Sequence, residues 1–177
     1  MAAVFDADET VIWNLGVTRY QSERGAGFDP DIWDNWEETG ADKVVAVPGA
    51  VAAFDRLRKA GLTIIINTNR VAKHAAPTAA ALRHAGLGEF QHGSTLYLKG
   101  DSLKPDQKPS SAKDGRRAAI SESYCIVILA GDQLGDISDE FNAKTLTPTT
   151  RRAMVNSTAF DDLWGKGWFV LPNPVYG

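Results

Sequence analysis

One stretch near the N-terminus decides the fold: Ala2-Ala3-Val4-Phe5-Asp6-Ala7-Asp8-Glu9-Thr10. Its short apolar run is typical of a buried strand and is followed at once by two carboxylates, Asp6 and Asp8. In an open α/β sheet, ligands bind at the carboxyl ends of the strands. The spacing therefore places one acid to act as a nucleophile and the other as a general acid and base. The alternative is that Asp8 or Thr10 merely caps the next segment.

Outward from this stretch, short apolar runs alternate with helical patterns, which is typical of a parallel sheet covered by helices on both faces. The clearest helical pattern puts Val51, Phe54 and Leu57 on one face. We predict an α/β three-layer sandwich with a mainly parallel central sheet. The expected strands are residues 2–5, 62–67, 95–98, 125–130 and 168–171, and the expected helices lie at about 48–60, at 77–84, from about 111, and after 148.

Residues 16–47 interrupt this rhythm with glycines, acidic residues and the aromatics Phe28, Trp33 and Trp36. We interpret them as a small insertion after the first strand, within a single domain of residues 1–177. Residues 100–111 are polar and contain two prolines, so a loop is expected there.

Polar groups also follow the second predicted strand, in Ile66-Asn67-Thr68-Asn69-Arg70. The hydroxyl of Thr68, the amide of Asn69 and the guanidinium of Arg70 suit phosphate oxygens, although turns rich in Asn and Thr are common after any strand. Lys113 stands at the expected start of the third helix, where backbone N–H groups and a positive charge can both face an anion. A solvated helical lysine is the alternative.

The fourth predicted strand ends in a further acidic pair, in Gly131-Asp132-Gln133-Leu134-Gly135-Asp136. Carboxylates gathered at one sheet edge repel one another unless a cation neutralises them, and hard oxygen ligands suit Mg²⁺. Together the motifs supply a nucleophile, an acid, oxyanion donors and metal ligands. This combination predicts phosphoryl transfer.

The composition excludes several classes of protein. Hydrophobic residues make up 44% and charged residues 23%, which is typical of a soluble globular chain and excludes disorder. The net charge of −3 gives no global positive field to attract nucleic acid polymers or anionic lipid. No stretch approaches the ~20 apolar residues of a membrane span, and the N-terminus lacks a signal-peptide pattern. Cys125, in an apolar run, is expected to be buried.

These motifs resemble the four motifs of the haloacid dehalogenase (HAD) superfamily, and the flanking residues resemble the bacterial class C, lipoprotein-type acid phosphatases and 5′-nucleotidases over almost the whole chain. The resemblance implies a HAD-like Rossmannoid fold. The stretches that carry it are Trp33-x-x-Trp36, Val47-Pro48-Gly49-Ala50, Thr68-Asn69-Arg70, Ser111-Ala112-Lys113-x-x-Arg116, Gly131-Asp132-Gln133-Leu134-Gly135-Asp136 and Leu171-Pro172-Asn173-Pro174-Val175-Tyr176-Gly177.

The resemblance also implies an activity. The chain would be a Mg²⁺-dependent phosphomonoester hydrolase that forms an aspartyl-phosphate intermediate, with nucleoside 5′-monophosphates or other small phosphomonoesters as substrates. Asp6 would be the nucleophile and Asp8 the general acid and base. Mg²⁺ would be held by the Asp6 carboxylate, the Asp8 backbone carbonyl and Asp132, with Asp136 supporting its water shell.

In the same family, Thr68 and Lys113 match positions that bind the phosphoryl oxygens. Trp33 and Tyr176 match an aromatic pair that stacks on the leaving group. The alternative for Trp33 is a core anchor of the insertion. The family usually has Asn at the position of Gln133. This difference affects the hydrogen bonds around Asp132.

The sequence lacks the lipid-attachment cysteine and signal of the lipoprotein branch. We therefore expect a soluble bacterial protein that is cytoplasmic as written, or else the mature part of an exported periplasmic enzyme or lipoprotein; a homodimer is left open. A receiver-like phosphoacceptor is disfavoured because no lone Asp follows Asn67. A non-catalytic nucleotide- or phosphate-binding module on the same fold is the other alternative, although such modules usually lose a carboxylate.

Overall fold

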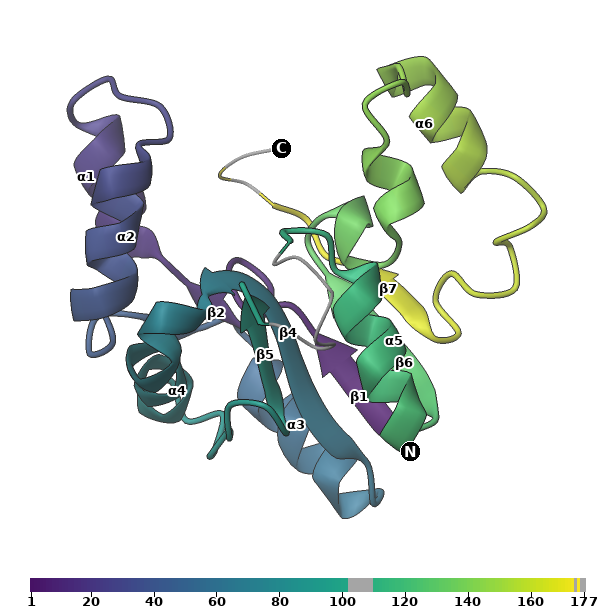
Figure 1. Ribbon diagram of the computed structural model, residues 1–177, viewed down its shortest axis with the longest axis horizontal. Helices are drawn as coiled ribbons and strands as arrows, with labels where there is room; N and C mark the ends of the chain where they lie inside the picture. The colour runs from purple at the N-terminus through teal and green to yellow at the C-terminus, as the bar shows by residue number, and fades with distance from the viewer. Residues whose placement is uncertain (102–109, 174, 176–177) are drawn as a thin grey trace.

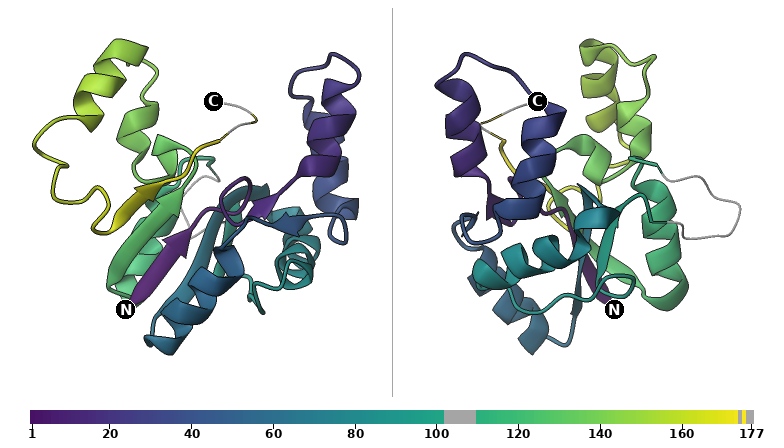
Figure 2. Two further views of the ribbon diagram at one scale, coloured as in Figure 1. Left: turned by 180° about the vertical axis from the view of Figure 1, so that it is seen from behind. Right: turned by 60° about the vertical axis from the view of Figure 1, so that its left-hand side comes forward.

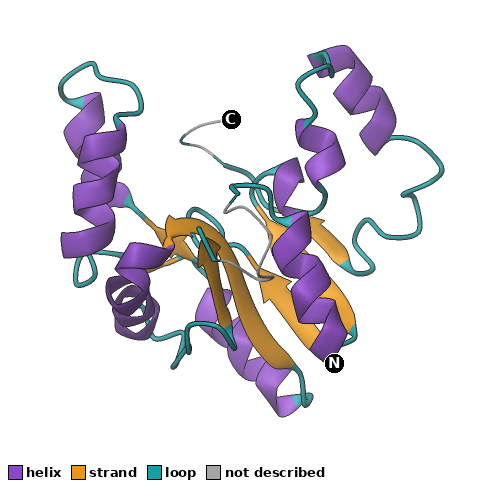
Figure 3. Cartoon of the chain, viewed as in Figure 1, coloured by secondary structure: helices purple, strands orange, loops and turns teal. Residues whose placement is uncertain are grey.

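The computed structural model describes residues 1–101, 110–173 and 175. Its centre is a sheet of five strands: β1 (Ala2–Phe5), β4 (Thr63–Val71), β5 (Leu96–Lys99), β6 (Ile126–Gly131) and β7 (Trp168–Val170). Their order is β5-β4-β1-β6-β7, and every neighbouring pair is parallel (Figures 1 and 3). Because β1 is central, its carboxyl end is flanked by those of β4 and β6.

Helices lie on both faces of this sheet (Figure 2). The predicted three-layer α/β fold with a parallel sheet is therefore confirmed. The helices that follow the strands are α3 (Ala50–Lys59), α4 (Ala75–His84), α5 (Asp114–Ser123) and α6 (Pro148–Val155), with short 3₁₀ helices η1 (Ala72–His74), η2 (Leu134–Asp136) and η3 (Asp139–Asn142).

The sheet has a packed core on each side because successive strand residues point to opposite faces. Ile64 and Ile66 of β4 pack in one core with Phe54 of α3. Ile65, between them, packs in the other core with Ile120 of α5. Both faces of β4 are thus buried, which explains why its sequence is a continuous apolar run rather than an alternating pattern.

Residues 16–47, expected as an insertion, contain two helices that the sequence analysis did not place. They are α1 (Leu15–Ser22) and α2 (Pro30–Thr39), and they follow β2 (Ile12–Trp13), which pairs antiparallel with β3 (Val45–Ala46). The start of α2 has a local cause, since the Asp29 carboxylate accepts hydrogen bonds from the N–H groups of Asp31 and Ile32 and Pro30 begins the helix. Figure 1 shows the α1–α2 pair standing apart from α6.

Three expectations about the strands and helices were wrong in detail. β4 continues to Val71 rather than ending at residue 67, so Thr68 and Asn69 lie within a strand. The helix expected from about residue 111 begins at Asp114. Cys125 is exposed, because β6 starts after it and β7 pairs with β6 only from Leu129 onward, which leaves this end of the sheet open on one side. Within the described residues, no helix combines the length and apolar character needed to cross a membrane.

Candidate active site

The carboxyl end of β1 fixes Asp6 at the edge of the sheet. The backbone N–H of Asp6 donates to the carbonyl of Ala130 in β6 (2.9 Å), which extends the pairing by one residue. The chain then turns tightly, with the N–H of Val11 donating to the carbonyl of Ala7 (2.9 Å). Glu9, inside this turn, has φ of 60°, a left-handed value that is uncommon for a residue with a side chain. Such backbone conformations concentrate at functional sites.

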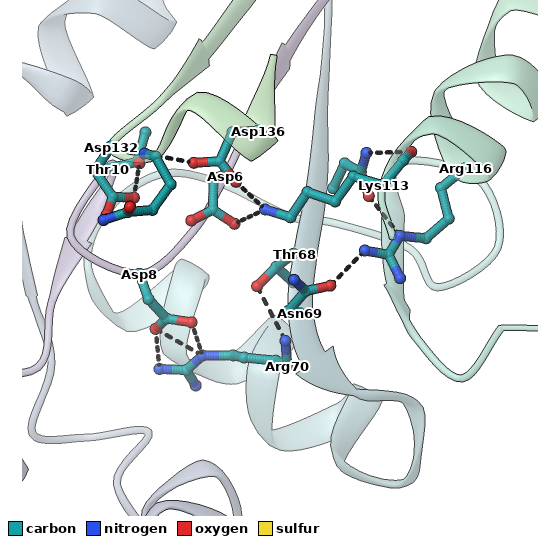
Figure 4. Close-up of polar contacts among 12 residues, drawn as sticks. Asp6, Asp8, Thr10, Thr68, Asn69, Arg70, Lys113, Arg116, Asp132 and Asp136 are labelled. Carbon is teal, nitrogen blue, oxygen red and sulfur yellow. Dashed lines mark hydrogen bonds and ion pairs between the residues drawn. The ribbon is translucent and has the colours of Figure 1, made fainter. Parts of the chain in front are cut away.

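Three carboxylates meet at this edge: Asp6 after β1, and Asp132 and Asp136 after β6 (Figure 4). One oxygen atom of each lies within 4.8 Å of the others. Lys113, directly before α5, reaches the same place, and its Nζ donates to Asp6 Oδ1 (2.5 Å) and Asp136 Oδ1 (2.6 Å). Only 4% of the Lys113 side chain and 11% of the Asp6 side chain are exposed. The structure thus brings together four of the residues predicted for the site.

The charges in this cluster strongly affect one another. Burial raises the pKa of Asp6 well above its usual value; Lys113 opposes that rise, and the nearby carboxylates, Asp136 first, add to it. Burial alone would lower the pKa of Lys113, but Asp6 and Asp136 together raise it above its ordinary value. The lysine therefore remains charged, yet one lysine among three carboxylates leaves an excess of negative charge.

The motif after β6 orients two of these acids. A Cβ at Gly131 would overlap the side chain of Asp136, so glycine is what allows Asp136 to fold back over the strand end. The backbone N–H of Gln133 donates to Asp136 Oδ2 (2.9 Å). Thr10 Oγ1 donates to Asp132 Oδ1 (2.8 Å). Each of these acids is thus held by a partner close in sequence, Gln133, and by a distant one, Thr10 or Lys113.

Gln133, the residue that departs from the family pattern, still contacts the acid beside it. Its Nε2 donates to Asp132 Oδ2 at 3.3 Å, and Asn173 Nδ2 donates to the same oxygen at 2.7 Å. Asn173 belongs to the C-terminal stretch quoted for the resemblance, but the sequence analysis gave it no role. Its contact places Asn173 beside the acidic cluster.

The donor chemistry of the cluster fits a divalent cation. Carboxylate oxygens are hard ligands of the kind that Mg²⁺ and similar ions prefer. Both oxygens of Asp136 already accept hydrogen bonds, from Lys113 and Gln133. The two oxygens of Asp132 also accept hydrogen bonds, from Thr10, Gln133 and Asn173. These contacts therefore do not distinguish direct ligands from ligands that act through water, and each of the three acids offers one oxygen to the same site.

The end of β4 presents polar groups beside this cluster. Thr68 is fully buried and its Oγ1 accepts the N–H of Arg70 (3.2 Å), so its own O–H can donate to an anion. Asn69 Oδ1 accepts from Arg116 Nη2 (2.6 Å), which orients the amide and leaves its N–H groups to face an anion. Arg116 also donates through Nε to Asn67 Oδ1 (2.6 Å). Arg116 was quoted in a motif, but its positioning contacts could not be read from the sequence.

The side chain of Asp8 points away from the acidic cluster and toward Arg70 (Figure 4). Arg70 Nη2 and Nε donate to Asp8 Oδ1 at 2.8 and 2.9 Å, and Asn14 Nδ2 donates to the same oxygen at 2.9 Å. Arg70 was predicted as a donor to phosphate oxygens, but in the structure its guanidinium pairs with Asp8; Asn14 was given no role. The spacing of Arg70 could have indicated its position, because it follows Thr68 by two residues and side chains two apart in a strand point to the same face.

The aromatic residues of α2 have different surroundings. Trp33 is half-buried; its Nε1 donates to Glu37 Oε1 (2.6 Å), and the Phe28 ring lies 6.4 Å away, centroid to centroid. Trp36 is buried and belongs to the core. Tyr176, expected to pair with Trp33, lies outside the described residues. Stacking of either residue on a leaving group thus stays a prediction.

Comparison with known proteins decides the family of this chain. The model of the HAD superfamily, subfamily IIIB (acid phosphatase), matches residues 1–177. The chain belongs to this acid phosphatase family. The resemblance predicted from the motifs is therefore confirmed.

Solved structures and curated relatives agree with this family. The class C acid phosphatase from Bacillus anthracis superposes with a TM-score of 0.80 at 26% identity, covering 99% of this chain and 67% of that chain. A second structure of the B. anthracis enzyme, with tungstate bound, gives a TM-score of 0.77 at 26% identity and covers 99% and 68% of the two chains. Acid phosphatase 1 from Solanum lycopersicum is 28% identical over 137 residues, which are 76% of this chain and 51% of the relative. The chain thus spans about half the length of that curated relative.

Proposed function

We propose that this member of the acid phosphatase family hydrolyses small phosphomonoesters in two displacement steps at the carboxyl edge of the sheet. The observation that carries the proposal is the convergence of the Asp6 carboxylate and the Lys113 ammonium, 2.5 Å apart, with Asp132 and Asp136. Such an arrangement supplies a nucleophile and a positive charge for a phosphoryl group. Phosphoryl transfer depends mainly on positioning and charge neutralisation of this kind.

In the first step, an Asp6 oxygen attacks phosphorus while the bond between phosphorus and the ester oxygen breaks. Lys113 and the hydroxyl of Thr68 bind the phosphoryl oxygens, and the Asn69 amide, oriented by Arg116, donates to the same group. Asp8 gives its proton to the departing alcohol. The products of this step are the alcohol, the Asp8 carboxylate and an aspartyl-phosphate.

In the second step, water attacks the phosphorus of the aspartyl-phosphate and Asp8 takes the proton of that water. The bond between phosphorus and the Asp6 oxygen breaks. Inorganic phosphate is released, and both acids return to their starting states. Asp8 thus acts once as an acid and once as a base, which suits a residue beside the nucleophile in sequence and outside the carboxylate cluster in space.

We further propose that the cofactor is Mg²⁺. Asp6 and Asp132 would hold the ion through their carboxylates and Asp8 through its backbone carbonyl, with Asp136 acting through water. When bound, the ion supplies positive charge that neutralises the phosphoryl oxygens and screens the carboxylates from one another. The excess of acids over lysines in the cluster supports this assignment.

The substrates we propose are nucleoside 5′-monophosphates or similar small phosphomonoesters. Residues 16–47 are proposed as the insertion that carries this selectivity, because the half-buried Trp33 and the exposed Phe28 form a tilted aromatic pair on and before α2. A flat ring between aromatic side chains gains stacking energy without hydrogen-bond readout. Trp33 and Tyr176 are the residues proposed to stack.

The direct test measures inorganic phosphate released from a nucleoside 5′-monophosphate with Mg²⁺, for the wild type and Asp6→Asn. We expect turnover in the wild type and a loss of at least about 10³-fold in the variant, since Asn cannot act as the nucleophile. Asp162→Asn, an exposed aspartate paired with Lys166, is the control and should keep wild-type turnover. Full activity of a clean Asp6→Asn preparation would exclude the mechanism.

The intermediate is tested separately by acid quenching with a ³²P-labelled aryl phosphate. An activated phenolate leaves without a proton, so Asp8→Asn should still form the aspartyl-phosphate but hydrolyse it slowly. We expect labelled protein that is stable to acid and labile to alkali in Asp8→Asn and is absent from Asp6→Asn. No label in either variant would argue for direct attack by water. Tungstate should compete with substrate in the wild type, since this oxyanion binds the B. anthracis relative.

A further inference from the structure

The amide of Asn14 lies at the centre of a buried network that the two-step mechanism does not itself explain. Asn14 is fully buried. Its Nδ2 donates to Asp8 Oδ1 (2.9 Å) and Glu9 Oε1 (3.1 Å), and its Oδ1 accepts from Trp36 Nε1 (2.8 Å) and Arg70 Nη2 (2.9 Å). A carboxamide has two N–H donors and two acceptor lone pairs, so all four positions are used.

Trp36 and Arg70 determine which way this amide faces. An indole N–H and a guanidinium can only donate, so they require the oxygen of Asn14 on their side. A flipped amide would place its N–H groups against these two donors and its oxygen against the carboxylates of Asp8 and Glu9. The bond from Trp36 thus holds the Asn14 N–H groups toward Asp8.

This orientation makes the two oxygens of Asp8 unequal. Oδ1 accepts three close hydrogen bonds, one from Asn14 and two from Arg70, at 2.8 to 2.9 Å. Among the described residues, Oδ2 accepts one longer bond, from Arg70 Nε at 3.2 Å. Oδ1 is therefore the fixed oxygen of the pair, and Oδ2 is the oxygen with fewer close donors.

We propose that Trp36 and Asn14 are positioning residues that hold the Asp8 carboxylate for proton transfer to the leaving group. Trp36 acts through Asn14, and Asn14 acts on Asp8 directly. This inference rests on the proposed function, because it assigns the device that aims the general acid. It also gives the α1–α2 pair a role in the chemistry as well as in substrate selection.

The docking of α2 supports this role, because the helix is attached at two neighbouring points. One turn of α2 carries Trp36, bonded to Asn14. The same part of the helix carries Glu37, whose Oε2 accepts the N–H of Val71 at the end of β4 (2.8 Å) and whose Oε1 accepts from Trp33. The position of α2 is thus tied to Asn14, which follows β2, and to the end of β4, which carries Arg70. Asn14 and Arg70 both donate to Asp8.

The test uses phenyl phosphates of similar shape whose leaving phenols differ in acidity. A nitrophenolate leaves without a proton, whereas an unsubstituted phenol benefits from one, so a misplaced general acid penalises phenyl phosphate more. We measure kcat/KM, which reports the steps up to release of the phenol. In Trp36→Phe, which removes the indole N–H, the ratio of kcat/KM for 4-nitrophenyl phosphate over phenyl phosphate should rise about ten-fold, a fraction of the ~10²–10⁴ supplied by a general acid.

Trp164→Phe is the matched control, because the indole of Trp164 donates to the carbonyl of Val155, away from Asp8. Its substrate ratio should equal that of the wild type. Asn14→Asp is the second variant: it keeps the shape of the side chain but replaces the N–H groups facing Asp8 with an oxygen, so its ratio should rise further. If Trp36→Phe does not fold, the substrate ratio of Asn14→Asp alone tests the positioning role.

The outcomes separate the two proposals. An active wild type with an unchanged ratio in folded Trp36→Phe or Asn14→Asp overturns the positioning role and leaves the proposed function standing. A wild type without turnover on these esters and on a nucleoside 5′-monophosphate overturns the proposed function and this inference with it. An equal fall on both esters would show that Trp36 only stabilises the fold, which also overturns the positioning role.

Discussion

At the scale of single residues, the site depends on buried cations whose partners are oxygens from several segments. Arg116 is 3% exposed, and its guanidinium donates to Asn67 Oδ1, Asn69 Oδ1 and the carbonyls of Leu98 and Ser110. None of these partners is a carboxylate, and burial lowers the pKa of Arg116. This position therefore requires the five fixed N–H donors of a guanidinium and not only its positive charge.

Arg116→Lys should therefore weaken both stability and substrate binding. A lysine cannot reach all of these oxygens, so we expect unfolding free energy to fall by about 1–3 kcal/mol because buried acceptors lose their donor. The amide of Asn69 also loses its fixed orientation, and kcat/KM for a phosphomonoester should fall about ten-fold, which is worth one hydrogen bond. Denaturant titration and steady-state kinetics check the two effects.

The control for this change is Arg58→Lys, since Arg58 Nη2 donates to the carbonyl of Leu87 away from the acidic cluster. It should alter stability slightly and leave kcat/KM unchanged. A normal kcat/KM in Arg116→Lys would show that Asn69 is oriented by other contacts.

Glu37 gives a pH-dependent prediction at the same scale. Burial raises its pKa above the usual value, although the N–H of Val71, Arg70 and the indole of Trp33 oppose the rise. The folded state then binds more protons than the unfolded state between the usual and the raised pKa, so the contribution of Glu37 to stability falls as pH rises through that window. Gln does not titrate. The unfolding free energy of the wild type should therefore exceed that of Glu37→Gln most at low pH, and this difference should shrink as pH rises.

Urea titrations of wild type and Glu37→Gln from about pH 4 to pH 8 measure this difference, because comparison of the pair cancels the other titrating groups. An advantage of the wild type that grows with pH would contradict the raised pKa.

At the scale of elements, the start of α5 is fixed by a residue far along the chain. The carboxylate of Asp139, in η3, accepts the backbone N–H groups of Lys113 (2.9 Å) and Asp114 (2.7 Å). A carboxylate at a helix N-terminus satisfies orphan donors and interacts favourably with the helix dipole. This long-range cap explains why the helix begins at Asp114 and why Lys113 projects toward Asp6.

Asp139→Ala should cost about 1–2 kcal/mol of stability, the value of a lost N-cap, and should also displace Lys113. We expect kcat to fall several-fold. Thr147→Ala is the matched control, because Thr147 caps α6 through a bond from the N–H of Thr150 (3.1 Å). It should lose comparable stability without a change in kcat. Equal kinetic effects of the two variants would argue that the cap matters only for the fold.

At the scale of the whole molecule, the parallel sheet collects three acids at one edge and thereby stores electrostatic repulsion. A cation that binds only the folded state stabilises it by mass action. Added Mg²⁺ should raise Tm; at about 100 times its dissociation constant the gain is about 2.7 kcal/mol, or roughly 5–10 °C for a chain of this size.

Asp132→Asn should abolish that rise, and the exposed Asp162→Asn should keep it. Differential scanning calorimetry with Mg²⁺ and with a chelator measures the shift. A rise in Tm with Mg²⁺ that is as large in Asp132→Asn as in the wild type would show that the ion binds elsewhere.

Much of the fold could be predicted because its signals are local. The apolar run of β1 with its two acids, the helical spacing of Phe54 and its neighbours, and the motif after β6 all lie within a few residues. The path of residues 16–47 could not be predicted, because α1 has no hydrogen-bonding cap side chain and α2 is stabilised by contacts of Trp36 and Glu37 with distant residues. The exposure of Cys125 was missed because burial depends on how far β7 extends.

The sequence by itself determined which residues follow each strand, and thus that Asp6, Thr68 and Asp132 share one edge of a parallel sheet. Only the tertiary structure decided which side chains touch. Lys113 reaches Asp6 across 107 residues of chain, and Arg70 reaches Asp8 across 62. Strand ends follow from short-range periodicity, whereas the partners of a buried charge depend on how helices pack over the sheet, and no local pattern encodes that packing.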